Sequence, residues 1–418
     1  MTCRTGSVET CIEGQESTLP GRRSTKGGTT ERKQTIEKTR AINKSINLPV
    51  VIVGGGPAGA ATAIALRRQQ IPCVVLEAGA SAGRKPGESI PPNARVTLKE
   101  LGIVHLLEDA QHQRCTGNTV VWGDDHPHDR FFFTETMGDG WHINRAFFEQ
   151  QLSQTAKSMG AYWLHDHHFT NWEQQEDHLL IHCSFGQGSS ISIKAAFAVD
   201  ASGRTAALAR KAGATRQSLD RLTGYYAIVP APLTALPSTT FIEATANGWW
   251  YAAALHDNHT VINFMTDADI HPIDNQPLVD WLFQQFRQTA HLQQCLPLSA
   301  GTDLQQVMAK PASTSFLTTP AGPHWLAVGD AACTYDPLTS YGITAALGSG
   351  LYAALAITDH LNGKELAKEA YCYIQQTTFN KCLAMLQHQY GLEKRWMERP
   401  FWQRRRAIQI KNEPRIIV

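Results

Sequence analysis

One short segment constrains the fold of this chain more than any other. The apolar residues 50–53 lead into three glycines in G-x-G-x-x-G spacing, namely Gly54, Gly56 and Gly59. In this spacing the first glycine permits a tight turn, the second removes the Cβ that would block a pyrophosphate, and the third lets the next helix lie close to the sheet. The pattern predicts a strand, a turn and a helix that hold a dinucleotide at the helix N-terminus.

The residues that follow complete a βαβ unit. A helix is expected over 60–70, and the next strand ends at Glu77, whose carboxylate can accept hydrogen bonds from ribose hydroxyls. The residues expected to contact the nucleotide here are Gly54, Gly56, Pro57, Ala58, Gly59, Glu77 and Ala78. This motif alone leaves both NAD and FAD open.

A second segment, 325–347, follows the same logic far downstream. A short apolar strand delivers Gly329 and Asp330, and an aspartate at that place can accept from ribityl hydroxyls. The turn 336–342 then leads into a helix of small residues, whose free N–H groups suit a phosphate or an electron-rich ring edge. A dinucleotide held by both ends of the chain predicts FAD.

Composition limits the other classes of function. The formal net charge of +1 gives no global field that would favour nucleic acid, and no apolar run approaches the roughly 18 residues of a membrane span. The nine cysteines are an odd number without C-x-x-C pairs, which favours reduced thiols and a cytoplasmic location. The histidines at 126–128 and 165–168 lack the partner spacing of a metal site, so no metal is expected.

Residues 1–46 differ from the rest of the chain. Ser, Thr, Gly, Lys and Arg dominate there without any apolar period, which predicts a disordered basic tail. A transit peptide and a mis-assigned start of translation remain alternatives for this segment.

Several motifs together carry a family resemblance. The glycine motif with Glu77, the sequence Asp200-Ala-Ser-Gly-Arg204, and Gly329-Asp330 with Pro337 and Gly342 resemble the three fingerprints of FAD-dependent monooxygenases related to p-hydroxybenzoate hydroxylase, over about residues 48–360. The segments 87–92, 140–148 and 248–251 resemble the tryptophan-halogenase-like branch. Within that branch the chain resembles most the flavoproteins that accompany quinoprotein amine or amino-acid oxidases and help to mature cysteine tryptophylquinone.

The resemblance implies an α/β (α+β) fold with a Rossmann-type FAD-binding domain, an antiparallel-sheet substrate domain and C-terminal helices. The FAD-binding domain is expected at 47–220 and 311–360, with about 105–135 contributing to the substrate side. The substrate sheet is expected at 221–310, where alternating segments such as 241–243 and 260–265 indicate antiparallel strands. A helical C-terminal segment is expected at 361–418.

The implied activity is that of an FAD-dependent monooxygenase, in which a flavin C4a-hydroperoxide passes one oxygen to an electron-rich aromatic carbon. The implied substrate is an aromatic small molecule or a precursor protein that presents tryptophan, and the electron donor is NAD(P)H or a separate flavin reductase. By resemblance, two loops and the strand ends hold the flavin, through Glu88, Ser89, Asp200, Gly329, Asp330, Pro337, Ser340, Gly342 and Ile343. Pro337 would lie against the reacting ring.

Aromatic residues supply the substrate candidates. Trp249, Trp250 and Tyr251 lie between two expected strands and can stack on an aromatic substrate, and Trp122 is a comparable candidate, as are His142 and Arg145. Because adjacent strand residues face opposite sides, at most alternate members of 249–251 can line one pocket, and the rest belong to a core. His142 can act as a general base at neutral pH, although a lone histidine is more often structural.

The sequence departs from the halogenases in two places. They carry Trp-x-Trp-x-Ile-Pro and a lysine that holds hypohalous acid, whereas 249–254 lacks the Ile-Pro and 111–122 offers no lysine. Hydroxylation is therefore favoured over halogenation. A geranylgeranyl-reductase-type oxidoreductase and a non-catalytic FAD-fold partner protein remain alternatives, because an FAD site does not fix what oxidises the flavin.

The segment from Gly391 onward is locally basic and contains two tryptophans, Trp396 and Trp402. The favoured interpretation is a solvated helix face with buried tryptophans, and docking of an acidic protein partner is the alternative.

Overall fold

The structure is a computed structural model that describes residues 47–407, with gaps at 80–84, 135, 232–234, 237, 271–275, 300–303, 305 and 365. The predicted disordered tail at 1–46 lies outside the described residues, as do residues 408–418.

The strand β1 (Asn47–Val53) lies at the centre of the largest sheet. Val50 and Ile52 pack into the core on one face of this sheet, and Val51 and Val53 pack into the core on the other. A strand that is buried on both faces needs the continuous apolar run seen here, which is typical of a parallel sheet covered on both sides.

The sheet has the order β19-β20-β11-β1-β2-β8, and β10 and β9 extend it beside β11. The strands β20, β11, β1, β2 and β8 pair in parallel, so their carboxyl ends meet at one edge, where a doubly wound fold binds its ligands. The strands other than β1 are β2 (Cys73–Glu77), β8 (Tyr162–His165), β9 (His167–Gln174), β10 (Leu179–Phe185), β11 (Ser189–Asp200), β19 (Ala321–Gly322) and β20 (Trp325–Ala327).

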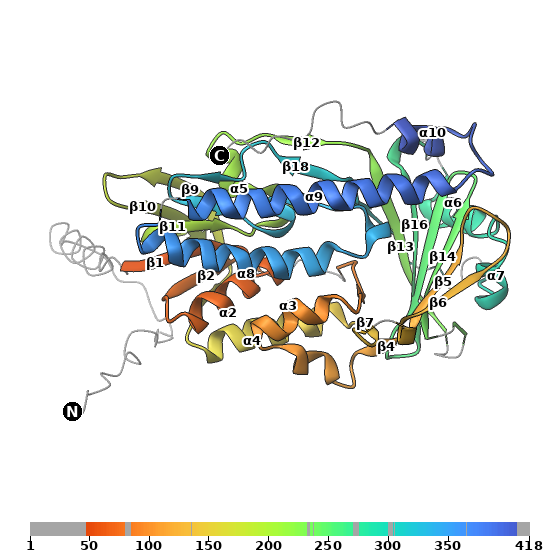
Figure 1. Cartoon of the computed structure of the whole chain (residues 1–418), viewed down its shortest axis with the longest axis horizontal. Coiled ribbons are helices and arrows are strands. Elements are labelled where there is room, and N and C mark those ends of the chain that lie inside the picture. Colours follow the sequence, from red (N-terminus) through yellow and green to blue (C-terminus); the bar gives the residue numbers. More distant parts are fainter. Residues whose placement is uncertain are drawn as a thin grey trace, which may run out of the picture. The chain divides into compact units, whose positions relative to one another are not determined.

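Helices α2 (Pro57–Arg68) and α8 (Gly342–Leu361) pack against each other over one face of this sheet (Figure 1). Their backbones come close at Gly350, where an added Cβ would lie 2.6 Å from the carbonyl oxygen of Ala58 and 2.9 Å from Cβ of Ala61. Helices α3 (Ala94–Leu101) and α4 (Arg145–Ser158) contribute Leu98 and Phe148, among others, to the same core.

A second sheet of seven strands has the order β17-β13-β16-β15-β14-β5-β6. All its pairs are antiparallel except β5 with β14. Its strands are β5 (Gly117–Val121), β6 (His128–Phe131), β13 (Leu222–Pro230), β14 (Thr239–Thr245), β15 (Gly248–Ala254), β16 (His259–Asp267) and β17 (Met308–Pro311). Helices α6 (Leu278–Phe286) and α7 (Leu292–Cys295) cover its aromatic core with Trp281, Phe286 and Leu292.

Two three-stranded sheets complete the fold. One joins β3 (Ser89–Ile90), β7 (Gly140–His142) and β4 (Gln113–Cys115), and the other joins β12 (Arg216–Ser218), β18 (Ser315–Leu317) and β21 (Cys333–Thr334). A short helix, α5 (Ala207–Lys211), follows β11.

The predicted fold class is confirmed, with local differences. The first helix begins at Pro57 rather than at 60, because proline has no N–H to lose at the first helical position, and it ends at Arg68. The expected strands at 241–243 and 260–265 lie in β14 and β16, but β15 lies between them and itself carries Trp249 to Tyr251. The described residues from Asn47 onward form a single compact unit, and the division at 220, 310 and 360 stays a prediction.

The helix α9 (Ala367–Leu392) connects the two large sheets. Its 26 residues extend about 39 Å, and Figure 1 shows it alongside α8. Near its start, Tyr371 donates to the carbonyl oxygen of Ala327 at 2.6 Å, and near its end the Tyr390 hydroxyl accepts from Trp249 at 3.0 Å. Among the described ranges, none of the helices combines the length and the apolar character that crossing a bilayer would need.

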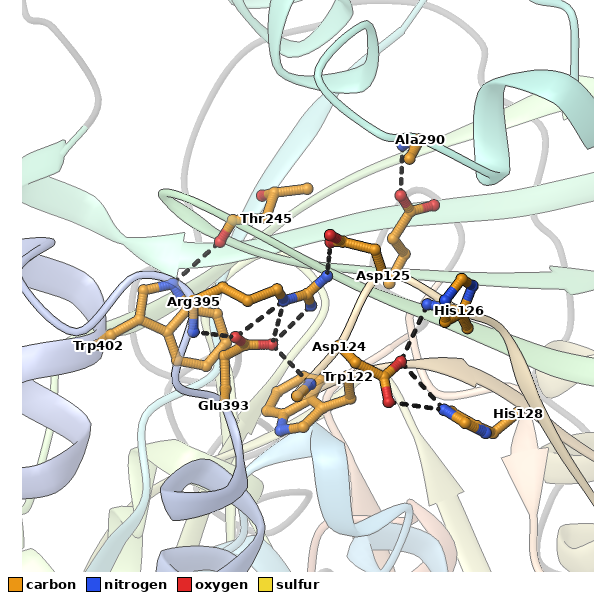
Figure 2. Close-up of polar contacts among 12 residues, drawn as sticks. Trp122, Asp124, Asp125, His126, His128, Thr245, Ala290, Glu393, Arg395 and Trp402 are labelled. Atoms are coloured by element: carbon orange, nitrogen blue, oxygen red, sulfur yellow. Dashed lines mark hydrogen bonds and ion pairs between the residues drawn. The ribbon is translucent and has the colours of Figure 1, made fainter.

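We call residues 389–406, which include α10 (Pro400–Ala407) up to Arg406, the C-terminal clamp (Figure 2). The buried carboxylate of Glu393 accepts from the backbone of Gly123 at 2.8 Å and from Arg395 at 2.6 Å. Trp122 donates to the carbonyl oxygen of Gln389, and Trp402 to that of Thr245, both at 2.9 Å. These bonds fasten the clamp to the turns of the second sheet.

Three arginines of the clamp form ion pairs within the chain. Arg405 donates to Asp267 at 2.7 Å with both side chains buried, Arg404 bonds to Asp267 and Asp269, and Arg395 reaches Asp125 at 2.8 Å. These pairs, and the burial of Trp402, favour a solvated helix face with buried tryptophans over a docking site for an acidic protein partner.

Replacing Arg405 with methionine should lower the free energy of unfolding by about 2 kcal/mol in urea denaturation. Breaking a buried ion pair costs about 3–5 kcal/mol, and Arg404 would still neutralise part of the Asp267 charge. As a control, Arg221→Met removes an exposed arginine 3.8 Å from Asp269 and should change stability by less than about 0.5 kcal/mol. Equal effects of the two substitutions would contradict the structural role of Arg405.

Candidate active site

The turn between β1 and α2 is shaped by its glycines. Gly54 has a φ of +107°, and a Cβ added there would overlap the carbonyl oxygen of Ala201. A Cβ on Gly59 would overlap the carbonyl oxygen of Gly54, so the helix can approach the strand only with glycine at this position. Around Gly56 nothing lies within 4 Å of an added Cβ, and this open space is where a ligand can approach the backbone.

The carboxylate of Glu77 lies beside this turn. The backbone N–H of Gly55 donates to it at 2.6 Å, which ties the end of β2 to the turn after β1. Burial raises the pKa of Glu77, and the Gly55 N–H and the nearby Lys85 oppose that rise. Glu77 and Ala78 therefore stand at the carboxyl edge of the sheet, where ribose hydroxyls are expected.

A cavity of about 610 Å³ extends from this turn to the second sheet. The cofactor side is lined by the β1–α2 turn, the end of β2, the loop 201–205 and the segments around Asp330 and Pro337. The far side is lined by one face of the second sheet, through Gly224, Tyr226, Tyr251, Asn263, Met265 and Lys310. The cavity thus joins a nucleotide cradle to a surface that is partly aromatic.

The structure brings most of the predicted cofactor residues to this cavity. Those that line it are Gly54, Gly56, Pro57, Ala58, Glu77, Ala78, Glu88, Ser89, Asp330, Pro337, Ser340, Gly342 and Ile343. Gly59 and Gly329 lie behind the lining, where they let α2, α8 and the strand ends approach: Gly329 has a φ of +55°, and a Cβ there would lie 2.7 Å from Cβ of Ala58.

Asp200 also lies behind the lining. Its carboxylate accepts from the N–H of Ser202 at 3.0 Å, from the Ser202 hydroxyl at 2.6 Å and from the N–H of Ala209 at 2.8 Å. These bonds fix the loop 201–205, which does line the cavity. We therefore assign Asp200 to positioning this loop rather than to direct contact with the cofactor.

The aromatic candidates separate as strand geometry requires. Tyr251 lines the cavity, whereas Trp250 faces the opposite side of β15 and stacks on Phe264. Trp249 lies on the same side as Tyr251 but packs against Trp122 in the core beneath the C-terminal clamp. The expected substrate contact is thus corrected to Tyr251 alone among these four residues, because the three tryptophans are buried in cores.

A group of charged residues also lines the cavity. Lys85 and Arg145 both bond to Glu149 at 2.7 Å, and Arg204 lies 3.7 Å from Asp330. Burial raises the pKa of Glu149, but Arg145 and Lys85 outweigh it and hold that pKa below its usual range. Arg145 was predicted as a substrate candidate beside His142, and Arg204 and Asp330 belong to the fingerprint motifs, whereas Lys85 and Glu149 had no such role in the sequence analysis.

The loop around Pro337 is held by a buried carboxylate. Asp336 caps the turn 337–339 by accepting from the N–H of Leu338 at 2.9 Å, and its other oxygen accepts from the Tyr390 hydroxyl at 2.9 Å. Burial, assisted by the charge of Asp220, raises the pKa of Asp336 to about 7. Asp336 therefore couples the loop around Pro337, which lines the cavity, to the end of α9.

The residues present fit FAD. The glycine turn is open at Gly56, and α2 starts there without a side-chain cap, so its first N–H groups are available to a pyrophosphate. The N-terminus of α8, at Gly342, lines the same cavity from the opposite end of the chain. FAD matches both helix ends, because its pyrophosphate can lie at the N-terminus of α2 and its ring system at the N-terminus of α8.

This combination of fold and site defines an FAD-dependent oxidoreductase. The family model described as an NAD(P)-binding Rossmann-like domain matches residues 52–90. The family model described as tryptophan halogenase matches residues 125–418, so the chain belongs to the tryptophan halogenase family.

Individual relatives agree with this assignment. The FAD-dependent oxidoreductase LodB of Marinomonas mediterranea is 26% identical, over 86% of this chain and 96% of its own length. The myxobacterial chondrochloren halogenase CndH superposes with a TM-score of 0.79 at 20% identity, over 86% of each chain. The peptidyl tryptophan dihydroxylase QhpG superposes with a TM-score of 0.71 at 24% identity, over 86% of this chain and 78% of its own.

Substituting Gly54 with alanine should abolish stable FAD binding, because the added Cβ overlaps Ala201 and the backbone has a positive φ. The measurement is the ratio of flavin to protein absorbance after gel filtration. Gly391→Ala is the matched control, since nothing lies within 4 Å of its added Cβ. A Gly54→Ala protein that keeps a full complement of flavin would refute this role for the turn.

The raised pKa of Asp336 predicts a pH-dependent stability. The folded protein binds this proton more tightly than the unfolded chain, so the contribution of Asp336 to stability is largest below about pH 4 and falls as the pH rises to about 7. As the pH rises through this window, the unfolding free energy of the wild type should fall relative to that of Asp336→Asn by on the order of 4 kcal/mol. A difference that is independent of pH would contradict the prediction.

Proposed function

We propose that this protein is an FAD-dependent monooxygenase that hydroxylates a tryptophan side chain presented by a precursor protein. The observation that carries the proposal is a continuous cavity that extends from the β1–α2 turn to the face of the second sheet bearing Tyr226 and Tyr251. An aromatic ring bound on that face would lie opposite the ring system of the cofactor. The similarity to QhpG, a peptidyl tryptophan dihydroxylase, supports a peptidyl tryptophan as the substrate.

The bound FAD would supply the oxygen-transfer chemistry, using electrons from NAD(P)H or from a separate flavin reductase. The residues of this chain bind, orient and exclude water. Gly54 to Ala58 and Glu77 would hold the dinucleotide, and Pro337 with the N–H groups at Gly342 and Ile343 would hold the ring edge. Tyr251 and Met265 offer an apolar floor for an aromatic substrate.

Halogenation is the second candidate function. The family model and CndH are both named for this reaction, and one observation on this chain favours it. The sequence offers no lysine at 111–122, yet the pairing of β17 with β13 sets Lys310 opposite Gly224, and both residues line the cavity. An ammonium group at this place is of the kind that can hold hypohalous acid beside a substrate.

One experiment separates these candidates. The protein is co-expressed with precursor proteins encoded nearby, and their tryptophan peptides are analysed by mass spectrometry, with and without added chloride and bromide. The proposal expects one or two added oxygen atoms on tryptophan in the presence of the wild type or Gly391→Ala, and none with Gly54→Ala. A chlorine or bromine isotope pattern that disappears in Lys310→Met would establish the halogenase instead. Oxidation of free aromatic compounds without any modified peptide would overturn the protein substrate.

A further inference from the structure

A buried hydroxyl behind the cavity connects a thiol to an imidazole. The Thr240 hydroxyl hydrogen-bonds with His142 Nε2 at 2.9 Å, with the Cys115 thiol at 3.6 Å and with the Ser89 hydroxyl at 3.4 Å. A hydroxyl can donate one hydrogen bond and accept two, so all three partners can be satisfied together. Thr240, His142 and Cys115 are each at most 3% exposed.

Strand pairing brings these residues together. In the three-stranded sheet, the central strand β7 pairs with β3 so that His142 lies opposite Ser89, and with β4 so that His142 lies opposite Gln113, two residues before Cys115. Thr240 comes from β14 of the second sheet, beside Cys115 and His142. The cluster therefore lies at the junction between the cofactor domain and the substrate sheet.

Two further hydroxyls connect the cluster to the cavity. Ser89 hydrogen-bonds with the Tyr251 hydroxyl at 2.7 Å, and both residues line the cavity, whereas Cys115, Thr240 and His142 do not. A continuous chain thus leads from Tyr251 through Ser89 and Thr240 to His142 and Cys115. Nδ1 of His142 is buried without a hydrogen-bond partner among the described residues, so within this part of the chain Thr240 is the hydrogen-bond partner of the imidazole.

The electrostatics of the cluster differ from those of the other buried thiols. Burial alone would raise the pKa of Cys115, but His142 and Thr240 outweigh burial and bring it down to about 7. Burial raises the pKa of Cys183 to about 11 and that of Cys333 to about 12. The other ionisable groups facing the cluster are Glu88, whose pKa is raised by burial against the charge of Arg145, and Tyr251, whose pKa is raised well above its usual value by burial and Glu88.

We propose that Cys115 and His142, joined by Thr240, form a proton-holding pair that exchanges a proton with the flavin-facing cavity through Ser89 and Tyr251. This inference rests on the proposed function to the extent that an aromatic ring is substituted in the cavity. Cys115, Thr240 and His142 act through Ser89 and Tyr251, so they are positioning residues rather than groups that touch the substrate.

The proton transfer balances without any change of oxidation state. When a substituted aromatic carbon loses its hydrogen as a proton, the electron pair of the C–H bond returns to the ring. Tyr251 accepts this proton and passes its own to Ser89, Ser89 passes one to Thr240, and Thr240 passes one to His142 Nε2 or to the Cys115 thiolate. Each hydroxyl ends with one proton, and one N–H or S–H bond forms. The transfer is the same for oxygen or halogen substitution, because either reaction releases this proton.

The first test follows the thiol itself in the FAD-loaded protein. Thiolate absorbance in the ultraviolet is recorded from about pH 5 to about pH 9, and the curve of Cys115→Ala is subtracted from that of the wild type. The difference should show one ionisation near pH 7, and Thr240→Val should move it upward. Cys183→Ala is the control, since its thiol should give no difference in this range. A Cys115 that ionises only above about pH 9 would overturn the proton pair.

The second test measures the single-turnover rate against pH. Cys115→Ala and Thr240→Val should lower this rate at neutral pH by about 10-fold or more and remove the ionisation near neutrality, while Thr240→Ser, which keeps the hydroxyl, should retain both. Profiles of Cys115→Ala and Thr240→Val that match the wild type would overturn the relay even if the thiol ionises near pH 7. A wild type that yields no substituted aromatic product would instead contradict the proposed function, and the thiolate titration tests the proton pair independently of that result.

Discussion

The close packing of α8 against α2 is the contact on which the cofactor site depends. Gly350 brings α8 to the backbone at Ala58, and Gly329 brings the end of β20 to the same alanine. A side chain at Gly350 would separate the helices, and one at Gly329 would push the turn after β20 away from α2. The helix N-termini, at Gly56 and Gly342, would then no longer face one cavity. Two segments from opposite ends of the chain thereby form a single site, and its orientation is set by small residues rather than by polar bonds.

A second constraint fixes the substrate sheet relative to this site. Helix α9 bonds to the parallel sheet through Tyr371 and to the second sheet through Tyr390, and the C-terminal clamp then closes over Trp122 and Trp249. The Tyr390 hydroxyl also donates to Asp336, so the loop that carries Pro337 is tied to the same helix. Trp122 and Trp249, which look like substrate contacts in the sequence, therefore serve as structural anchors between the two halves, and Tyr251 is left facing the cavity.

The two halves of the site were predictable to different degrees. The cofactor half depends on local conformation. The positive φ at Gly54 and the close approach at Gly59 each require glycine, so the sequence shows glycines at a fixed spacing. The substrate half depends on strand pairing between distant segments. No local pattern shows that Lys310 lies opposite Gly224, that Lys85 and Arg145 share Glu149, or that Cys115 and His142 share Thr240.

By itself, the sequence determined the class of cofactor, the strand–turn–helix that holds it and the α/β fold around it. Spacing of glycines and acids is enough for this, because a backbone turn and a helix N-terminus are local structures that recognise a pyrophosphate in the same way in any such fold. The tertiary structure alone decided which side chains face the ring system. That choice depends on sheet register and on which aromatic side chains are buried in the cores. A strand residue acquires its partner and its side of the sheet only when the sheets have assembled.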